Sequence, residues 1–203
     1  GQRVLEETLT LTPPNRFRLD EIAEFGTRPM RAALSGEVTV IYEGVVDNGR
    51  LTGLTADAVQ HDWSDLPVEV LTYLWPSRYC PSDEFGRFVE REFGSLSGGA
   101  QVLAIDRAGV CRDFTHLGIT LCRAAGIPAR AVSAYADQLS PPDFHAVFEV
   151  WLSDGWWLID PTGLAPVAGL VRIASGRDAA DIAFLSTQGA CEMVHQTITV
   201  QAV

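Results

Sequence analysis

The 203-residue chain lacks any apolar run long enough to cross a bilayer, and its first seven residues lack the apolar segment of a secretory signal peptide. Positive charge is scarce, because 15 Lys and Arg stand against 26 Asp and Glu, which gives a net charge of -11 and a pI of about 4.7. Such a surface repels nucleic acid and anionic membranes, so we expect neither as a partner.

Cysteine is also scarce. The four residues, Cys80, Cys111, Cys122 and Cys191, are widely spaced and form no Cys-x-x-Cys pair, which argues against a zinc knuckle or a thioredoxin motif. A domain of this size does not need disulfide bonds for stability, so we favour free thiols in a reducing cytoplasm. No loop has the Asp, Asn and Glu spacing of a Ca²⁺ site, and we expect neither a metal nor an organic cofactor.

The rest of the composition suits a folded protein with one substantial core or two small ones, since 47% of the residues are hydrophobic and 20% are charged. Residues 4 to about 60 predict β structure. Val4–Leu11 alternates between apolar and polar residues, and Val38–Tyr42 is rich in β-branched residues. The segment Asp47-Asn48-Gly49-Arg50 predicts a hairpin turn into a strand at Leu51–Thr55.

Helical periodicity is clearest after Gly109. Apolar residues recur at helical spacing as far as Ala125, Gly126 suits the position after a helix, and Pro128 would stop it. A shorter helix is predicted at 84–93. Strands are predicted at 129–135, 146–152, 156–159 and 196–203, with a hairpin at 153–155 and a late helix at 178–185.

Cys111 falls in the first turn of the longer predicted helix. Free backbone N–H groups and the positive end of the helix dipole stabilise a thiolate there, and Arg112 adds positive charge. The same N–H groups could bind an oxyanion. The alternative is that Cys111 is a small buried apolar residue, as most cysteines are, and we give the other three cysteines that interpretation.

His145 begins a predicted strand, and Asp160 follows the next strand of a predicted hairpin. A short hairpin loop would place both residues on the same sheet face, as diagonal neighbours or nearly so. A half-buried carboxylate requires a partner, and His145 is the nearest candidate. The alternatives are a rim histidine bonded to a carbonyl and an aspartate that forms an Asx turn before Pro161. His116 competes for the role of base, but five residues of helix separate its direction from that of Cys111.

Several segments resemble the bacterial transglutaminase-like family, a branch of the papain-like cysteine fold. These segments are 109–117 (GVCRDFTHL), 126–130 (GIPAR), 144–146 (FHA), 159–162 (IDPT), 76–80 (PSRYC) and 176–181 (GRDAAD). Residues 1 to about 75 are similar to that family's β-rich N-terminal domain. The resemblance implies that Cys111, His145 and Asp160 are catalytic. One departure is that residues 101–105 run directly into 106–109, where the family has more helix and a Thr/Ser-rich loop.

We therefore expect an α+β fold with a β-rich domain over residues 1–75 and a transglutaminase-like (cysteine protease-like) catalytic domain over 76–203, in which a central helix packs on an antiparallel sheet. Attack of the Cys111 thiolate on an amide carbonyl of a peptide or protein would give a thioester. We favour its hydrolysis, as in a cysteine protease. One alternative is transfer to an amine, as in a protein-glutamine transglutaminase. The other is an inactive binding or scaffold module, which the departure at 101–109 favours and the intact set of Cys111, His145 and Asp160 opposes.

Overall fold

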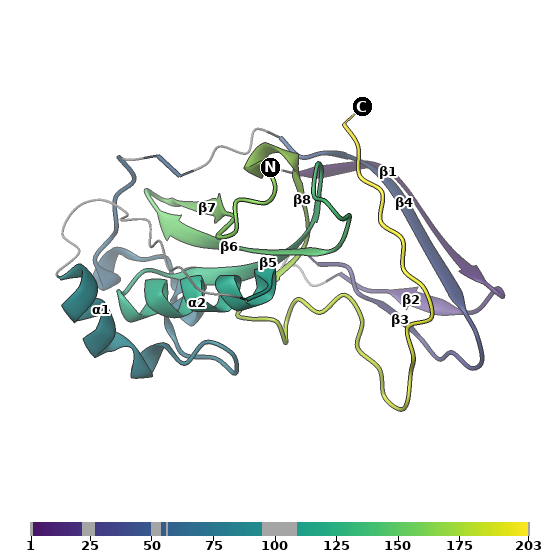
Figure 1. Cartoon of the computed structure of the whole chain (residues 1–203), viewed down its shortest axis with the longest axis horizontal. Helices are drawn as coiled ribbons and strands as arrows, with labels where there is room; N and C mark the ends of the chain where they lie inside the picture. The colour runs from purple at the N-terminus through teal and green to yellow at the C-terminus, as the bar shows by residue number, and fades with distance from the viewer. Residues whose placement is uncertain (1, 22–26, 50–53, 56, 95–108, 203) are drawn as a thin grey trace. The chain divides into compact units, whose positions relative to one another are not determined.

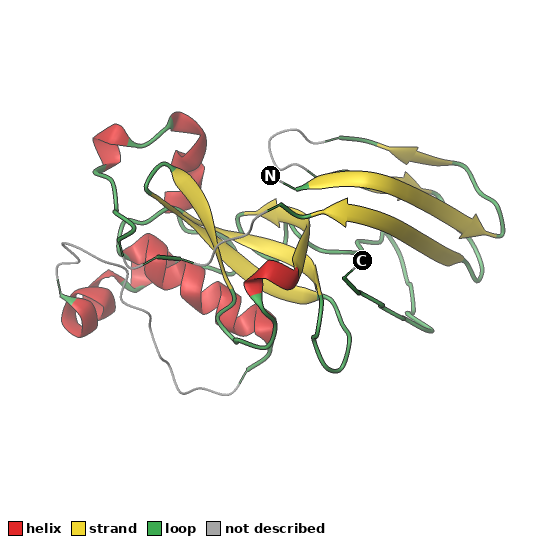
Figure 2. Ribbon diagram, turned by 90° about the horizontal axis from the view of Figure 1, so that it is seen from above, coloured by secondary structure: helices red, strands yellow, loops and turns green. Residues whose placement is uncertain are grey.

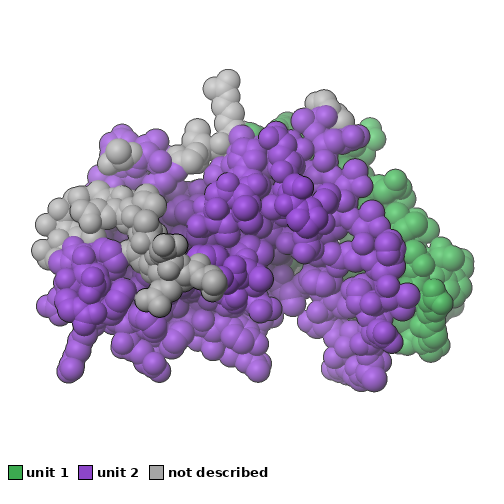
Figure 3. Space-filling model, viewed as in Figure 1, with its two compact units in different colours: residues 1–50 green, residues 51–203 purple. Residues whose placement is uncertain are grey.

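The computed structural model describes residues 2–21, 27–49, 54–55, 57–94 and 109–202. The chain divides into two compact units, residues 1–50 and residues 51–203 (Figure 3). The domain boundary near residue 75 stays a prediction, since compactness does not locate the start of a family domain.

The first unit consists of two pairs of antiparallel strands. β1 (Arg3–Thr12) pairs with β4 (Thr39–Asp47), and β2 (Phe17–Leu19) pairs with β3 (Met30–Ala32). The β character predicted for this region is therefore present. The predicted strand at 51–55 lies mostly outside the described residues, and its described positions 54 and 55 are not in a strand.

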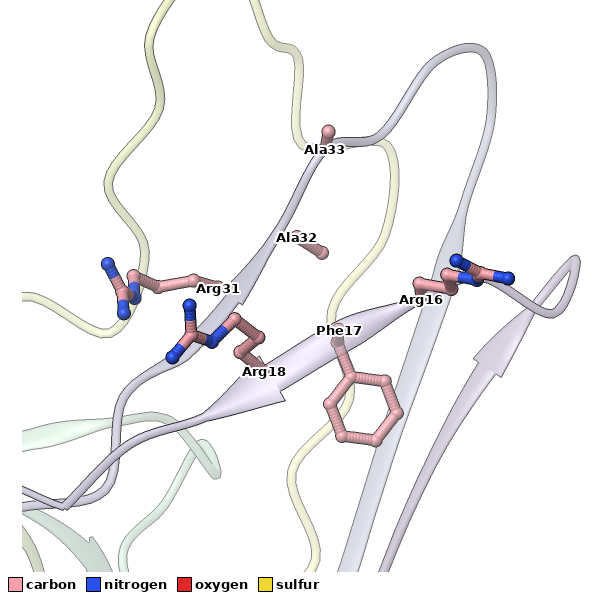
Figure 4. A pocket seen from close by; sticks show the side chains of 6 residues that line it. All are labelled: Arg16, Phe17, Arg18, Arg31, Ala32 and Ala33. Carbon is pink, nitrogen blue, oxygen red and sulfur yellow. The ribbon is translucent and has the colours of Figure 1, made fainter.

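A shallow pocket on the β2–β3 hairpin is lined by Arg16, Phe17, Arg18, Arg31, Ala32 and Ala33 (Figure 4). Arg31 lies 2.8 Å from the Asp20 carboxylate, and Arg18 lies 3.9 Å from it. This carboxylate offsets part of the positive charge. The pocket holds no thiol, imidazole or carboxylate of its own lining, so it is not the candidate active site.

The second unit is a helical segment followed by a four-stranded sheet (Figure 1). Its elements are η1 (Trp63–Asp65), η2 (Val68–Leu74), η3 (Ser82–Glu84), α1 (Gly86–Phe93), α2 (Cys111–Ala124), β5 (Ala129–Ala136), β6 (His145–Leu152), β7 (Gly155–Ile159), η4 (Val167–Gly169) and β8 (Leu170–Gly176). The strands lie in the order β7-β6-β5-β8, and each neighbouring pair is antiparallel. Helix and antiparallel sheet together confirm the predicted α+β class.

Helix α2 has the bounds that the sequence indicated to within two residues. The Asp113 side chain reaches back and accepts a hydrogen bond of 3.1 Å from the Val110 N–H, which satisfies one donor at the helix start. At the other end Gly126 has φ of +79°, a left-handed conformation that glycine adopts without strain. Local chemistry at both ends thus fixes where Cys111 begins the helix.

α2 covers one face of the sheet (Figure 2). The apolar core between them comprises Ala58, Cys80, Ile119, Ala129, Ala131, Phe148, Val150, Leu152 and Ile182. Gly118 allows the closest approach, because a Cβ built there would lie 2.6 Å from the Phe148 ring. A second core cluster involves strand residues that do not belong to the first cluster. It comprises Val132, Ala134, Ala136, Val147, Leu158, Ala165 and Leu170.

The hairpin between β6 and β7 is confirmed. Its two-residue loop, Ser153 and Asp154, has φ of +47° and +59°, the conformation of a type I′ turn, which matches the twist of the flanking strands. This tight loop fixes the register, so that Phe148 is opposite Ile159 and Trp151 opposite Trp156.

Two predicted elements near the C-terminus are wrong, and one strand was missed. Residues 178–185 form turns rather than a helix, because the Asp178 carboxylate accepts a bond from the Ala180 N–H and so competes with helical bonding. The described part of 196–203 is not a strand. β8 pairs with β5 instead and completes the sheet. Among the described residues, no helix has both the length and the apolarity that a membrane crossing requires.

Candidate active site

The three predicted site residues each stand at the end of a regular element. Cys111 is the first residue of α2, His145 is the first residue of β6, and Asp160 directly follows β7. Side chains at such positions are held by a rigid scaffold but reach the edge of it. The sheet and helix therefore position all three, and the structure brings them together.

His145 and Asp160 are in direct contact. The His145 Nε2 atom lies 2.9 Å from the Asp160 Oδ2 atom, and the two side chains are 1% and 2% exposed. The register explains this contact, since Phe148 opposite Ile159 places Asp160 opposite Val147, and His145 is then its diagonal neighbour. The contact that we predicted from the fifteen-residue spacing is present.

Four donors surround the Asp160 carboxylate. Oδ2 also accepts a bond of 3.2 Å from the Ala165 N–H, and Oδ1 accepts bonds from the Thr162 N–H and hydroxyl at 2.9 and 2.6 Å. The Asx turn named as an alternative thus coexists with the His145 contact. Burial raises the pKa of Asp160, but the bonds from His145 and Thr162 outweigh it and lower the pKa to about 2. The group is an oriented carboxylate at neutral pH.

The His145 imidazole is stabilised in its charged form. Burial lowers the pKa of His145, but hydrogen bonds to Asp160 and Cys111 outweigh burial and raise this pKa to about 9. Since Nε2 faces Asp160, the nitrogen available to the Cys111 sulfur is Nδ1. The ring therefore bridges the thiol and the carboxylate.

The Cys111 thiol is half-buried, and its pKa lies below the ordinary value. The largest cause is the hydrogen bond with His145, which burial opposes, and the N–H groups of Ala146 and Arg112 lower the pKa further. These partners come from the strand opposite and from the first turn of the helix. Both pKa shifts favour the charged form of their group, which is the direction that a thiolate–imidazolium pair requires.

His116 is held away from this chemistry. Its Nε2 accepts a bond of 3.1 Å from the Ala179 N–H, and its ring stacks on Tyr79 with 5.3 Å between ring centroids. Burial lowers the pKa of His116, and an Nε2 that accepts a bond implies a neutral ring protonated on Nδ1. The competitor thus has a structural role in joining α2 to residues 79 and 179.

Two buried charged groups that hold this scaffold could not be recognised from the sequence. Arg123, 3% exposed, donates to the carbonyl oxygens of Ala129, Trp75 and Arg177 and to the Ser77 hydroxyl. Glu149, fully buried, accepts bonds of 2.7 Å from Arg130 and 2.6 Å from Arg172. These contacts join segments far apart in the chain, so no local pattern could reveal them.

Within the described part of the chain, no group of three or more His, Cys, Asp or Glu is arranged to hold a metal ion. A lowered thiol pKa, a basic imidazole and a fixed carboxylate suit nucleophilic attack on a carbonyl with proton transfer to the departing group.

Residues 87–161 match the model of the transglutaminase-like superfamily, a range that contains all three site residues. The chain is 34% identical to the solved structure of a "putative cysteine protease" from Cytophaga hutchinsonii, with a TM-score of 0.76 over 98% of this chain and 82% of that one.

Curated relatives occur in mycobacteria. An uncharacterized protein of Mycobacterium leprae is 34% identical over 84 residues, which is 37% of this chain and 30% of that protein. An uncharacterized protein of Mycobacterium tuberculosis is 32% identical over 103 residues, which is 43% of this chain and 33% of that protein. The chain thus matches about a third of the length of these relatives.

Proposed function

Because the chain belongs to the transglutaminase-like superfamily, we propose that it is a cysteine-dependent acyl-transfer enzyme that hydrolyses an amide bond of a peptide or protein. Cys111 is the nucleophile, His145 is the general base and acid, and Asp160 orients the imidazole and stabilises its charge. We propose this reaction for the domain that the structure describes. That the substrate of the whole protein is a peptide or protein is likewise a proposal.

The observation that carries the proposal is the chain of hydrogen bonds from Asp160 through His145 to Cys111. A histidine with a purely structural role needs a hydrogen-bond partner at only one of its ring nitrogens. Here both ring nitrogens are engaged, one by a buried carboxylate and the other by a half-buried thiol at a helix start. That combination is what activates a thiol as a nucleophile.

The contacts of Cys111 and His145 support the following first half of the proposed reaction. The Cys111 thiolate forms a bond to the amide carbonyl carbon, and the oxygen gains negative charge. The N–H group of Cys111, at the start of α2, is the donor that we assign to this oxygen. When the C–N bond breaks, His145 gives its proton to the leaving nitrogen, and a thioester on Cys111 remains.

The second half uses the neutral His145 as a base. It takes a proton from water, whose oxygen attacks the thioester carbonyl, and the thiolate then leaves as the acid product is released. Asp160 has no proton to exchange, because its four donors hold it as a carboxylate. The net reaction is amide plus water to acid plus amine.

Hydrolysis is favoured over transfer by the surroundings of the thiol. Val110 and Arg112, which flank Cys111, are both well exposed, so water can reach the thioester from this side. A transferase would have to exclude that water to favour an amine. Amine transfer remains the second candidate because the same acyl-enzyme intermediate serves both reactions.

The two reactions can be measured together. The purified chain is incubated with a dimethylated casein and a fluorescent primary amine, and new amino groups and amine incorporation are followed separately. The chain contains no lysine, its fifteen basic residues all being arginine, so its own side chains supply no competing amine. We expect release of new amino groups to exceed amine incorporation.

Cys111→Ala is the critical variant and Cys191→Ala, at an exposed position, is its matched control. We expect the first to abolish both reactions and the second to leave both unchanged. Full activity in Cys111→Ala would show that Cys111 is not the nucleophile. Absence of both reactions in the parent chain, together with no reaction of the Cys111 thiol with an alkylating agent, would make the inactive binding module the better interpretation.

A further inference from the structure

Three aromatic rings gather around Phe144, the residue directly before His145. The Phe144 ring, directly before this residue, lies 4.4 Å from the Phe184 ring in a stacked arrangement and 5.7 Å from the Tyr135 ring. Phe184 is 56% exposed although it is stacked on its neighbour. An aromatic group left half in water next to a reactive centre offers apolar contact area to a ligand.

The direction of β6 relative to α2 places this aromatic cluster (Tyr135, Phe144 and Phe184) in front of the nucleophile. The Ala146 N–H bonds the Cys111 sulfur, and Phe148 packs on Gly118. The strand and the helix therefore run the same way from the site. Phe144 directly precedes β6. If the alternation of β6 is continued by one residue, Phe144 lies on the same sheet side as Ala146 and Phe148, about 7 Å beyond Ala146 and past the helix start, and its ring contact with Tyr135 agrees with this placement.

Tyr135 supports the same placement from the neighbouring strand. Ser133 is opposite Ala146 in the β5–β6 register, so Tyr135, two residues on, is level with Phe144. Burial raises the pKa of the Tyr135 phenol, which indicates an apolar environment at this end of the sheet. The aromatic cluster is thus a continuous surface built from β5, the start of β6 and the segment after β8.

The role of His145 decides which part of a substrate meets this surface. The imidazole protonates the leaving nitrogen, so the leaving amine departs on the side of His145. Phe144 is joined covalently to His145, and Phe184 stacks on Phe144. The acyl part, held by the thioester, instead stays over Cys111.

We propose that Phe144 and Phe184 form a binding surface for an apolar, preferably aromatic, group on the amine side of the scissile amide. The proposal rests on the proposed function of Cys111 and His145. It states that the enzyme cleaves before apolar or aromatic residues. If an amine replaces water, the same surface receives it, and apolar amines are the better acceptors.

The test uses cleavage of a mixture of peptides of known sequence, with the new N-termini identified by mass spectrometry. Two synthetic peptides are then compared, identical to the best substrate except for Phe or Gly on the amine side of the cleaved bond. We expect the new N-termini to be enriched in Phe, Tyr, Trp and Leu. Phe184→Ala should lower the Phe-to-Gly ratio of kcat/KM roughly tenfold.

Trp75→Ala is the matched control, because Trp75 is also an exposed aromatic residue, at 52%, but lies beside Trp63 near the other end of α2. It should leave the ratio unchanged. Phe184→Tyr keeps an aromatic ring and should restore the ratio, which a general loss of folding in Phe184→Ala would not explain. Thermal unfolding of each variant and the alkylation rate of Cys111 are measured alongside.

Two outcomes overturn the inference in distinguishable ways. If the parent chain cleaves peptides with no preference on the amine side, or Trp75→Ala changes the ratio as much as Phe184→Ala does, the aromatic surface has no part in specificity and the proposed function stands. If the parent chain neither cleaves peptides nor reacts through Cys111, the proposed function fails, and the inference fails with it.

Discussion

The substitution Asp160→Asn replaces one carboxylate oxygen by an NH₂ group and leaves the shape of the side chain unchanged. In the parent chain every partner of Asp160 is a donor, namely His145, Ala165 and both groups of Thr162. The Asn amide has only one oxygen, so its NH₂ group must face either His145 and Ala165 or the two donors of Thr162. Whichever way it rotates, one backbone N–H, that of Ala165 or that of Thr162, loses its acceptor, and a second partner must accept a bond instead of donating one.

The more damaging consequence concerns the His145 tautomer. With the Asn oxygen toward Thr162, which offers two donors, the Asn NH₂ faces His145 Nε2 and requires that nitrogen to accept. The proton of a neutral imidazole then moves to Nδ1, the nitrogen facing Cys111. The ring can no longer take the proton of the thiol, so the nucleophile stays a thiol.

The size of the effect follows from the pKa values. Asp160 contributes to the rise of the His145 pKa from 6.5 to about 9, a change equivalent to roughly 3 kcal/mol in total. Loss of this support together with the wrong tautomer should lower kcat by roughly 10² to 10⁴. The depressed pKa of Asp160, about 2 against 3.8, corresponds to roughly 2 kcal/mol of folding stability at neutral pH.

The pH dependence gives a second measurement. Because the folded pKa of His145 is raised, its contribution to stability is complete below pH 6.5 and is lost as pH rises through about 9. That of Asp160 is present above pH 3.8 and is lost as pH falls through about 2. The lowered pKa of Cys111 acts in the opposite direction over this range, so the comparison is made in the Cys111→Ala background. There, denaturant unfolding between pH 6 and 10 should show a loss of stability that flattens when Asp160→Asn is added.

The assay compares peptide cleavage, unfolding and alkylation of Cys111 in the parent chain and in Asp160→Asn. Thr162→Val is a useful companion, since it removes one donor to the carboxylate but leaves the His145 contact and the charge. It should reduce kcat much less than Asp160→Asn. Parent-like turnover in Asp160→Asn would show that Asp160 only forms the turn, and the tautomer argument would be refuted.

Three further predictions concern the helix and its thiols. Alkylation at pH 7 should modify Cys111 before Cys122, because the pKa of Cys111 is lowered and burial raises the pKa of Cys122 to about 12. Peptide mass spectrometry locates the label, and earlier labelling of Cys122 would contradict the assignment of Cys111 as the nucleophile. Gly118→Ala should lower the free energy of unfolding by about 1–3 kcal/mol, measured in urea, because its Cβ meets the Phe148 ring; Gly86→Ala, with open space, is the control. Arg123→Met should lower the free energy of unfolding in urea by about 3–5 kcal/mol, because three carbonyl oxygens lose their donor. A decrease of less than about 1 kcal/mol would refute this expectation.

The sequence could predict the elements whose determinants are local. The apolar period and Gly126 define α2, and a two-residue loop at Ser153 and Asp154 defines the β6–β7 hairpin. Once the hairpin is fixed, the contact between His145 and Asp160 follows by counting residues along two strands. Two of the three candidate site residues could therefore be placed next to each other without coordinates.

The errors lie where distant residues decide the local structure. Asp178 accepts bonds from the Tyr79 and Ala180 N–H groups, and this pairing across the chain turns a helix-like segment into turns. β8 was missed because its pairing partner, β5, precedes it by more than thirty residues. The Arg123 and Glu149 contacts are of the same kind, since buried charge is recognised only when its partners are known.

Cys111 and Cys122 show how position alone separates two identical groups on one helix. Eleven residues apart, they lie on similar sides of α2, so neither periodicity nor composition distinguishes them. Cys122 packs on the core, where burial outweighs the effect of the Arg123 charge and raises the pKa of its thiol to about 12. Cys111 is partly buried too, but the helix start gives it the Arg112 N–H, and the strand opposite gives it Ala146 and His145. A reactive thiol therefore requires two features. One is a position at a helix start, which the local sequence determines, and the other is a base that the sheet places next to the thiol.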